Sequence, residues 1–433
     1  MTPPPPSDFE TNKETRTMGN KIKITGGVDV GNGYVKAALR GENGKADKFD
    51  IPSGVALVTG AVDLPTPDTA AVEVVGGDIF NELDVTFASP LVGSTHRHLF
   101  GRRALKAQTP RFEEFDVVSG ISKAEQSLTK VLVMGLFAGK ALRDYVIEHG
   151  ALPTEQLDVE VRVALALPID EFREHRFAFA ESFKHGAHLV TVLNFETPVI
   201  VRLTFVDVQV AAEGASAQFA IRQHGVALAE QLLVDVRKHG QALEGITGQD
   251  IFDATSTVGI DIGEGTVNFP VYSGAKFNGD ASRTFGKGYG TVLNNSLVPL
   301  KRAGLPFNSR KALADYLLSE PSPLKRAEHA KVAAIVAEQA ELFSEQVVEE
   351  FRKILAEVGR DTEVIYVFGG GSGSVRPSLH PKLLEVVPEG TPVLFLDVSY
   401  SRHLNREGLL IAASLVEDQV AAQKAKKQAP AAA

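Results

Sequence analysis

Apolar residues form short strand-like runs in five parts of the chain. Residues 21–29 and 34–40 predict two strands that double back around a Gly-rich turn. Further strands are expected at 159–167, 199–210 and 364–368. The last run, Val-Ile-Tyr-Val-Phe, is typical of a buried strand.

Apolar residues recur at helical spacing in three longer segments, 126–149, 218–239 and 323–355. In the third segment the apolar positions are Val332, Ile335, Val336, Leu342, Val347 and Phe351. Their spacing drifts from a strict heptad, so we expect an amphipathic helix with one solvated face rather than a coiled coil. Because strands and helices alternate, the pattern predicts an α/β fold.

The length of 433 residues predicts two domains, because one hydrophobic core usually supports roughly 250–300 residues. We expect domain I at 21–215, domain II at 216–400, and a closing helix at 401–420 that returns to domain I. Within domain I, residues 54–102 have short strand-like pieces among Pro and Gly. This segment is expected to be an inserted subdomain that stands off the domain.

The composition and charge of the chain narrow its possible location, chemistry and partners. Residues 1–20 and 421–433 lack periodicity and are expected to be disordered tails. We expect a cytoplasmic protein without a membrane partner, because no apolar run approaches the roughly 18 residues of a membrane helix and no signal peptide is evident. The absence of cysteine removes disulfides, thiolate catalysis and Cys-zinc sites. The net charge of -9 argues against direct, sequence-independent DNA binding, which needs clustered Lys and Arg.

Two turns of nearly the same sequence carry the most informative chemistry. Asp29–Gly33 (Asp-Val-Gly-Asn-Gly) and Asp261–Thr266 (Asp-Ile-Gly-Glu-Gly-Thr) each follow an apolar strand. An Asp at a strand end can hold a metal ion or its water, and glycines let backbone N–H groups approach phosphate oxygens. One such turn alone is usually only a β-turn, since Asp, Asn and Gly are preferred turn residues. The pair indicates a nucleotide held between two related halves.

A third Gly-rich segment follows the last predicted strand. Gly369–Gly373 (Gly-Gly-Gly-Ser-Gly) offers a bare backbone platform for an adenosine. A Rossmann site fits poorly, because Ser374 occupies the third Gly position of that fingerprint and the strand lies near the end of the chain. A P-loop is excluded, since the sequence contains no Gly-x-x-x-x-Gly-Lys-Ser/Thr.

In this order and spacing, the three motifs resemble those of the actin-fold ATPases, and the ParM-like bacterial actins that segregate plasmids are the most similar. The resemblance covers residues 21–415 in organisation, although only the short motifs are specific. Pro52-Ser53 after the first turn also matches, and Asn405–Leu409 resembles the turn that opens the family's closing helix. The resemblance implies an actin-like fold, with two related α/β domains around a central nucleotide cleft.

The resemblance implies ATP and Mg²⁺ as ligands, with Asp29 and Asp261 holding Mg²⁺ through water. The implied nucleotide contacts are Gly31, Asn32, Gly33, Gly263, Glu264, Gly265, Thr266, Gly369, Gly370, Gly371 and Ser372. Glu264 departs from the family, which often has Gly there. This turn is therefore expected to sit farther from phosphate or to place its carboxylate near the metal.

Glu213 is the catalytic candidate, together with Asp29 and Asp261. It follows the strand at 199–210, at a corner where the resembled family uses an acidic residue to orient the water that attacks the γ-phosphate. Alternatively, Glu213 only lies at a helix N-terminus, where the macrodipole favours acidic side chains by roughly 0.3–1 kcal/mol.

Gly288 and Gly290 precede a predicted helix at 292–300. They are candidates for the ribose or adenine face, or alternatively belong to a flexible loop.

The resemblance implies an ATPase that polymerises: ATP assembles protomers head to tail, and hydrolysis weakens the filament. The expected partners are other copies of the chain and a small DNA-binding adaptor, through which plasmid or phage DNA is moved without direct DNA binding. The alternatives are a non-polymerising kinase-like enzyme and a nucleotide-gated interaction ATPase of the same superfamily. A kinase needs a second pocket with an acceptor-activating carboxylate, and no convincing motif for it is present in the sequence.

Overall fold

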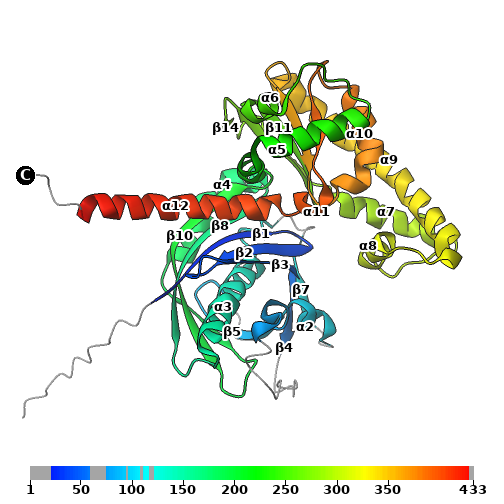
Figure 1. The fold of residues 1–433 in the computed structure, drawn as a ribbon. Helices are drawn as coiled ribbons and strands as arrows, with labels where there is room; N and C mark the ends of the chain where they lie inside the picture. The colour runs from blue at the N-terminus through cyan, green and yellow to red at the C-terminus, as the bar shows by residue number, and fades with distance from the viewer. Residues whose placement is uncertain (1–20, 59–74, 94–95, 108–110, 117–120, 429–433) are drawn as a thin grey trace, which may run out of the picture.

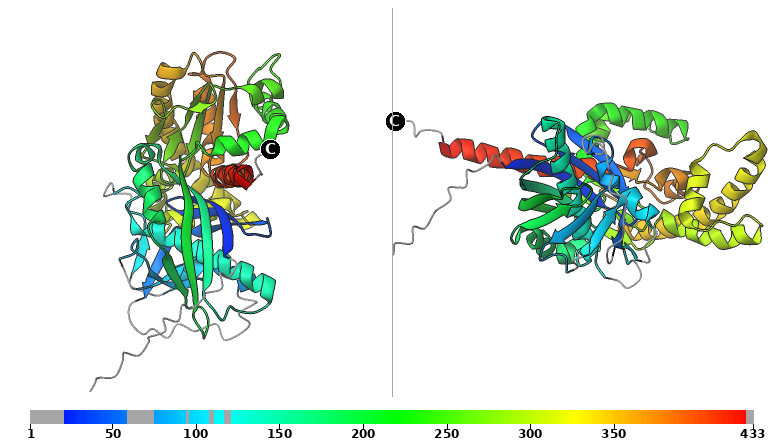
Figure 2. Two further views of the ribbon diagram at one scale, coloured as in Figure 1. Left: turned by 90° about the vertical axis from the view of Figure 1, so that its left-hand side faces the viewer. Right: turned by 90° about the horizontal axis from the view of Figure 1, so that it is seen from below.

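Two halves, one above the other in Figure 1, make up the structure, a computed structural model. It describes residues 21–58, 75–93, 96–107, 111–116 and 121–428. A long C-terminal helix, α12 (Leu404–Gln428), runs between the halves. Each half contains a sheet with helices packed against it, as the alternating pattern predicts (Figures 1 and 2).

The first half is built around one sheet in the order β3-β2-β1-β8-β10-β9-β5-β6-β4-β7. Its strands are β1 (Ile22–Val30), β2 (Tyr34–Arg40), β3 (Ala46–Pro52), β4 (Gly54–Val58), β5 (Asp84–Ala88), β6 (Arg97–Phe100), β7 (Phe112–Glu114), β8 (Leu157–Leu167), β9 (His188–Val192) and β10 (Val199–Ala212). Its helices are η1 (Ile79–Asn81), α2 (Gly101–Lys106), α3 (Ser127–His149) and α4 (Ile169–Lys184). Because β1, β8 and β10 are parallel, their carboxyl ends lie at one edge of the sheet.

The second half repeats the central arrangement of the first. Its strands are β11 (Thr257–Ile262), β12 (Val267–Phe269), β13 (Val271–Ser273), β14 (Lys276–Phe277), β15 (Arg283–Phe285), β16 (Val364–Phe368) and β17 (Val393–Phe395). Its helices are α5 (Ala217–Lys238), α6 (Gly248–Asp253), α7 (Tyr289–Arg302), α8 (Arg310–Leu318), η2 (Pro323–Lys325), α9 (Arg326–Val358), α10 (Ser372–Leu384) and α11 (Val398–Ser401). β11 pairs antiparallel with β12 and parallel with β16, just as β1 pairs with β2 and β8.

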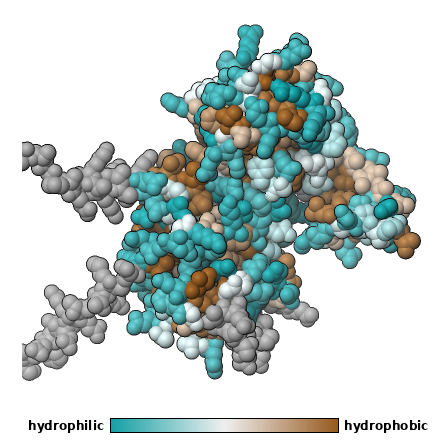
Figure 3. All heavy atoms as spheres, in the orientation of Figure 1, coloured by the Kyte–Doolittle hydropathy of each residue, from teal (hydrophilic) through white to brown (hydrophobic). Residues whose placement is uncertain are grey.

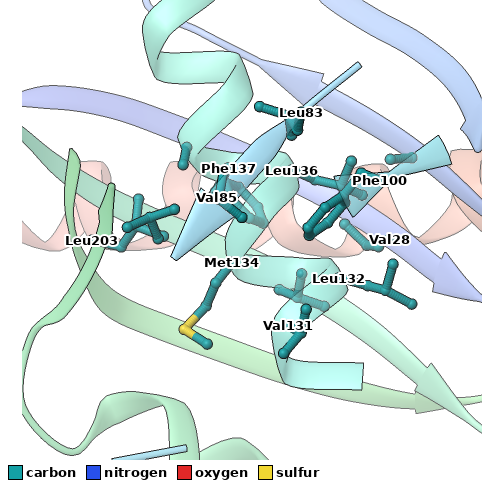
Figure 4. Close-up of a cluster of buried hydrophobic side chains, with 14 of the residues drawn as sticks. Val28, Leu83, Val85, Phe100, Val131, Leu132, Met134, Leu136, Phe137 and Leu203 are labelled. Atoms are coloured by element: carbon teal, nitrogen blue, oxygen red, sulfur yellow. The ribbon is translucent and has the colours of Figure 1, made fainter. Parts of the chain in front are cut away.

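The core of the first half surrounds α3, which is apolar on nearly all sides and is therefore a buried helix. Figure 4 shows Leu136 and Phe137 of α3 among side chains from several strands, including Val28 and Phe100. The helix ends at Gly150, whose left-handed backbone forms its C-cap. Neither α3 nor any other helix in the described parts of the chain is long and apolar enough to cross a membrane.

The central strand β1 is covered by helices on both faces. Successive residues of a strand point to opposite faces. A methyl group on Gly26 would meet Phe137 of α3, whereas one on Gly27 would overlap the backbone of α12 at Arg406 and Leu410. The two adjacent glycines therefore let α3 and α12 approach β1 closely from opposite sides.

The expected strands and long helices are confirmed as β1, β2, β8, β10, β16, α3, α5 and α9, and the helix expected at 292–300 is part of α7. Residues 54–102 differ from the expectation, because their described parts do not stand off the first half. β5 pairs with β9, and Leu57, Val85 and Phe100 belong to the core around α3. This segment extends the sheet, and residues 59–74 lie outside the described part.

The tail expected at 421–433 also differs, because α12 continues to Gln428. Its last residues are mainly Ala, Gln and Lys, which are strong helix formers. Residues 429–433, and the tail expected at 1–20, lie outside the described residues.

Replacing Gly27 with Ala should destabilise the fold by about 3 kcal/mol, because the added methyl group meets helix backbone that cannot move aside. Gly93→Ala is the matched control, since its methyl group would meet no atom within 4 Å. The free energy of unfolding in urea measures both effects. Equal stability of the two variants would contradict the close approach of β1 and α12.

Candidate active site

The β1–β2 turn and the β11–β12 turn, from opposite halves, lie directly against each other. Oε2 of Glu264 lies so close to Gly33 that a methyl group there would overlap it. In return, the Asn32 side-chain amide packs against Gly265, which has no room for a methyl group either. The structure thus brings together the two motifs that are widely separated in the sequence.

Two other Gly-rich segments donate hydrogen bonds to the backbone of the β11–β12 turn and the strand before it. Tyr289 N–H donates to Gly263 O (2.9 Å) and Gly290 N–H donates to Glu264 O (2.9 Å). From the β16–α10 turn, Gly371 N–H donates to Ile262 O (2.9 Å). These glycines therefore support the turn, and their predicted contacts with ribose or adenine remain predictions.

The residues of the turn after β16 differ from one another in exposure and in contacts. Gly369 has φ = 95° and packs against Asp261, so a side chain there would be both strained and crowded. The Ser372 hydroxyl is fully buried and donates to Gly369 O (2.8 Å). Gly370 is exposed, and it is the position of this turn best placed to face a ligand.

Three buried carboxylates gather where the strands end. Asp29 lies near the end of β1, Asp261 near the end of β11, and Glu213 directly after β10. Each is only 5–6% exposed. Burial raises the pKa of Asp29, and the charge of Glu213 raises it further. Burial likewise raises the pKa of Asp261 to about 7, with smaller contributions from Asp29 and Glu213. The three groups therefore repel one another in a setting that disfavours charge.

Two lysines offset part of this negative charge. Lys123 Nζ donates to Glu213 Oε1 (2.8 Å) and to Val30 O (3.1 Å), and both side chains of this ion pair are buried. Burial lowers the pKa of Lys123, but Glu213 beside it more than reverses this effect, and the pKa is raised overall. Lys36 Nζ lies 3.7 Å from Asp29 Oδ2. Three carboxylates thus face two cations.

Two asparagines connect these carboxylates across the halves. Asn268, on β12, donates from Nδ2 to Glu213 Oε2 (3.0 Å). Asn405, at the start of α12, donates from Nδ2 to Asp261 Oδ2 (2.8 Å), and its Oδ1 accepts from Gly214 N–H (3.1 Å). Glu213 and Asp261 are therefore each held by a residue of another element.

This network bears on the helix-terminus interpretation of Glu213, while its catalytic role stays a prediction. Its carboxylate oxygens bond to Lys123 and Asn268, and its backbone N–H donates to Leu167 O (2.7 Å). The helix α5 begins only at Ala217, after an N-cap residue, Ser216, whose side chain makes no capping bond. Glu213 is therefore held in the site and does not cap the helix.

Sequence reasoning missed Lys123, Lys36 and Asn268, and considered Asn405 only as part of a helix-opening turn. Asn268 had a usable signal, because it stands two positions after Thr266, and side chains two positions apart on an extended chain point to the same side. Lys123 had none, since it lies in a loop far along the chain from every motif.

The Asp261 carboxyl should make the stability of the ligand-free protein depend on pH. The pKa of this carboxyl is about 7 in the folded protein, against an ordinary value of 3.8. The unfolded chain therefore loses this proton at a lower pH than the folded protein does. The contribution of this group to stability is complete below pH 3.8 and is lost as the pH rises to about 7. Relative to wild type, Asp261→Asn should therefore gain stability between about pH 4 and pH 8, by at most about 4 kcal/mol. Urea unfolding measures this, and a pH-independent difference would contradict the buried, raised carboxyl.

Neither a protein-family model nor a curated protein sequence matches the chain. Solved structures do. The actin-like protein Alp7A is similar with a TM-score of 0.62 and 17% identity, over 94% of this chain and 100% of that one. A non-polymerisable quadruple mutant of pCBH ParM gives a TM-score of 0.57 at 14% identity, over 91% and 99%. Bacillus thuringiensis ParM with ATP gives a TM-score of 0.54 at 17% identity, over 91% and 99%. At these identities the similarity is one of fold, and the chain has the actin-like fold.

Proposed function

We propose that this protein binds Mg²⁺·ATP between the β1–β2 and β11–β12 turns, hydrolyses it, and uses the cycle to assemble and disassemble filaments of its own copies. The observation that carries the proposal is the meeting of the two turns beside the buried carboxylates of Asp29, Glu213 and Asp261. Glycine backbones that approach one another without side chains suit phosphate oxygens. The match to a ParM bound to ATP supports the choice of nucleotide.

Mg²⁺ fits the charge of this site. A divalent cation with oxygen ligands would relieve the repulsion among these carboxylates, which Lys36 and Lys123 offset in part. Within the described residues, no three acidic or histidine side chains form a ready-made metal site. Asp29 and Asp261 are therefore proposed to hold the ion through water, in the way Mg²⁺ commonly binds beside phosphates. When bound, Mg²⁺ offsets the charge that develops on the leaving diphosphate.

Glu213 is proposed to orient the attacking water. Its carboxylate lies at the seam between the halves and is held from both sides by Lys123 and Asn268. A carboxylate fixed in this way can accept a hydrogen bond from a water without rotating away. Lys123 also places a positive charge 2.8 Å from the Glu213 carboxylate.

Filament formation and DNA movement are supported less directly. One similar structure is a ParM mutant described as non-polymerisable, which makes assembly a natural proposal for this chain. The net charge of -9 favours a small DNA-binding adaptor over direct DNA contact. The proposed cargo is a plasmid or phage genome. ATP-dependent pelleting together with phosphate release tests the whole function, and phosphate release without pelleting would favour the kinase-like alternative.

Glu213→Gln should separate binding from chemistry. The amide keeps the shape and the contact with Lys123 but is a poor acceptor for a water proton. ATP affinity should change less than about threefold, while hydrolysis should slow at least a hundredfold and filaments should persist. Calorimetry and phosphate release measure the two effects, and hydrolysis at the wild-type rate would remove Glu213 from the mechanism.

Glu264→Gly should strengthen ATP binding. The Glu264 carboxylate lies against Gly33 of the opposite turn and is held by Arg310 (3.0 Å). A phosphate that approaches the same backbone meets a like charge, so removing this carboxylate should raise ATP affinity about tenfold. Glu264→Gln, which keeps the size, distinguishes charge from bulk. Weaker binding by both variants would show instead that the carboxylate helps to hold the metal.

A further inference from the structure

The residue before the last glycine differs between the two turns that meet in the site. It is Asn32 in the β1–β2 turn and Glu264 in the β11–β12 turn. The Asn32 amide packs against Gly265 of the opposite turn. In the same way, the Glu264 carboxylate packs against Gly33. Because a neutral amide is sufficient for this packing in one turn, the charge of Glu264 calls for a separate reason.

The Glu264 carboxylate lies between bare backbone and a cation. Its Oε2 is the atom that a methyl group on Gly33 would overlap, and its Oε1 lies 3.0 Å from Nη2 of Arg310. A nucleotide phosphate presents the same features as this carboxylate, namely negative oxygens that accept hydrogen bonds from a guanidinium. The carboxylate therefore stands at a position that suits a phosphate oxygen.

Arg310 is held at this position by α8. The helix begins after Ser309, whose hydroxyl accepts a hydrogen bond from the Ala312 N–H (3.1 Å), and Leu313 anchors it in the core of the second half. A methyl group on Gly290, at the start of α7, would lie 3.5 Å from Nη1 of Arg310. An anchored helix thus directs the guanidinium at the Gly-rich turn.

The next residue of α8 reaches the first half. Lys311 Nζ donates to Tyr34 Oη (3.4 Å), and Tyr34 directly follows Gly33. Lys311 also pairs with Asp315 on the next turn of α8 (3.1 Å). Figure 3 shows that the end of the second half that carries α7 and α8 projects beyond the first half, with hydrophilic residues on its lower side. The first turn of α8 therefore places two cations beside the β1–β2 and β11–β12 turns.

The ion pair of Arg310 with Glu264 is weak enough to be exchanged. The two side chains are 40% and 36% exposed, and an ion pair that water reaches contributes little to stability. A phosphate that approaches Gly33 must displace the Glu264 carboxylate, because the two anions would meet in the same space and repel each other. This displacement separates Arg310 from its carboxylate, and a phosphate oxygen is the group that can replace it.

We propose that the Glu264 carboxylate occupies the place of a nucleotide phosphate, and that Arg310 passes from Glu264 to that phosphate when Mg²⁺·ATP binds. The inference rests on the proposed function and adds to it the residue that exchanges an internal ion pair for one with the ligand. Arg310 is then a phosphate-binding residue, and Glu264 is a competitor that the ligand displaces. The exchange also transfers α8 from the β11–β12 turn to the ligand.

A double-mutant cycle on the full-length protein tests this exchange, with the affinity for Mg²⁺·ATP measured by calorimetry. Arg310→Gln should weaken ATP binding at least about thirtyfold, because it removes the phosphate contact and leaves the Glu264 charge unpaired beside the ligand. In the Glu264→Gly background, the same substitution should still weaken binding about tenfold, since only the phosphate contact is then lost. The double variant should therefore bind ATP about as tightly as wild type.

Two further measurements separate a phosphate contact from other effects. Arg326→Gln removes one exposed cation at the start of α9 and should bind ATP as wild type does. The loss that Arg310→Gln causes in the Glu264→Gly background should shrink at high salt, because a contact between partly exposed charges is screened. Urea midpoints equal to wild type confirm folding, and Arg310→Met takes the place of Arg310→Gln if that variant unfolds.

Each contrary outcome has its own meaning. If Arg310→Gln has no effect in the Glu264→Gly background, Arg310 serves only to neutralise Glu264, and the exchange is wrong. An equal loss in Arg326→Gln, or a loss in Arg310→Gln that is independent of salt, also overturns the exchange. These results leave the proposed function intact, whereas a wild-type protein that binds no Mg²⁺·ATP overturns the proposed function and this inference with it.

Discussion

The burial of negative charge where the two sheets meet is the constraint on which the rest of this structure depends. Asp29, Asp261 and Glu213 lie at strand ends with almost no exposure to water. Removing charges from water costs several kcal/mol each unless partners compensate. The ion pair of Glu213 with Lys123 compensates one of them, and hydrogen bonds from asparagines support two. The remaining excess of negative charge leaves the site prepared for a cation.

This compensation also joins the halves. Glu213 ends a strand of the first half and accepts a hydrogen bond from Asn268 of the second. Asn405 links the start of α12 to Asp261 on β11 and to the corner at Gly214. Any change in charge at the site therefore acts on bonds that span the seam. This is a physical route by which a ligand between the turns can alter how the halves sit.

The candidate site also depends on backbone segments that approach one another closely. Gly33 and Gly265 leave space for the turns to touch, and Gly27 and Gly408 let α12 lie against β1 and the start of α5. These glycines stand at contacts between segments far apart in the sequence, where a Cβ would separate the packed elements. The glycine motifs thus serve the packing that positions the candidate site.

The sequence predicted the elements whose patterns are local. Strands β1 and β16, the helix α3 and the two Asp-Gly turns follow from periodicity and turn chemistry, and the resemblance of the three Gly-rich motifs to those of the actin-fold ATPases led to the fold. Lys123 and Asn268 could not be predicted in the same way, because their roles arise from contacts with residues far along the chain. The segment at 54–102 was misjudged for a related reason: its short strands become part of the main sheet only by pairing with β9.

Calorimetric titration of ATP with Mg²⁺, and again with the metal chelated, tests the central claim most directly. A site that lies between the two turns and has more negative than positive side chains should bind one ATP per chain when Mg²⁺ is present. Without Mg²⁺, ATP should bind at least about tenfold more weakly. Binding should also fall when Asp29 and Asp261 are both replaced by Asn. Absence of binding, or equal affinity with and without Mg²⁺, would contradict the assignment of this seam as a metal–nucleotide site.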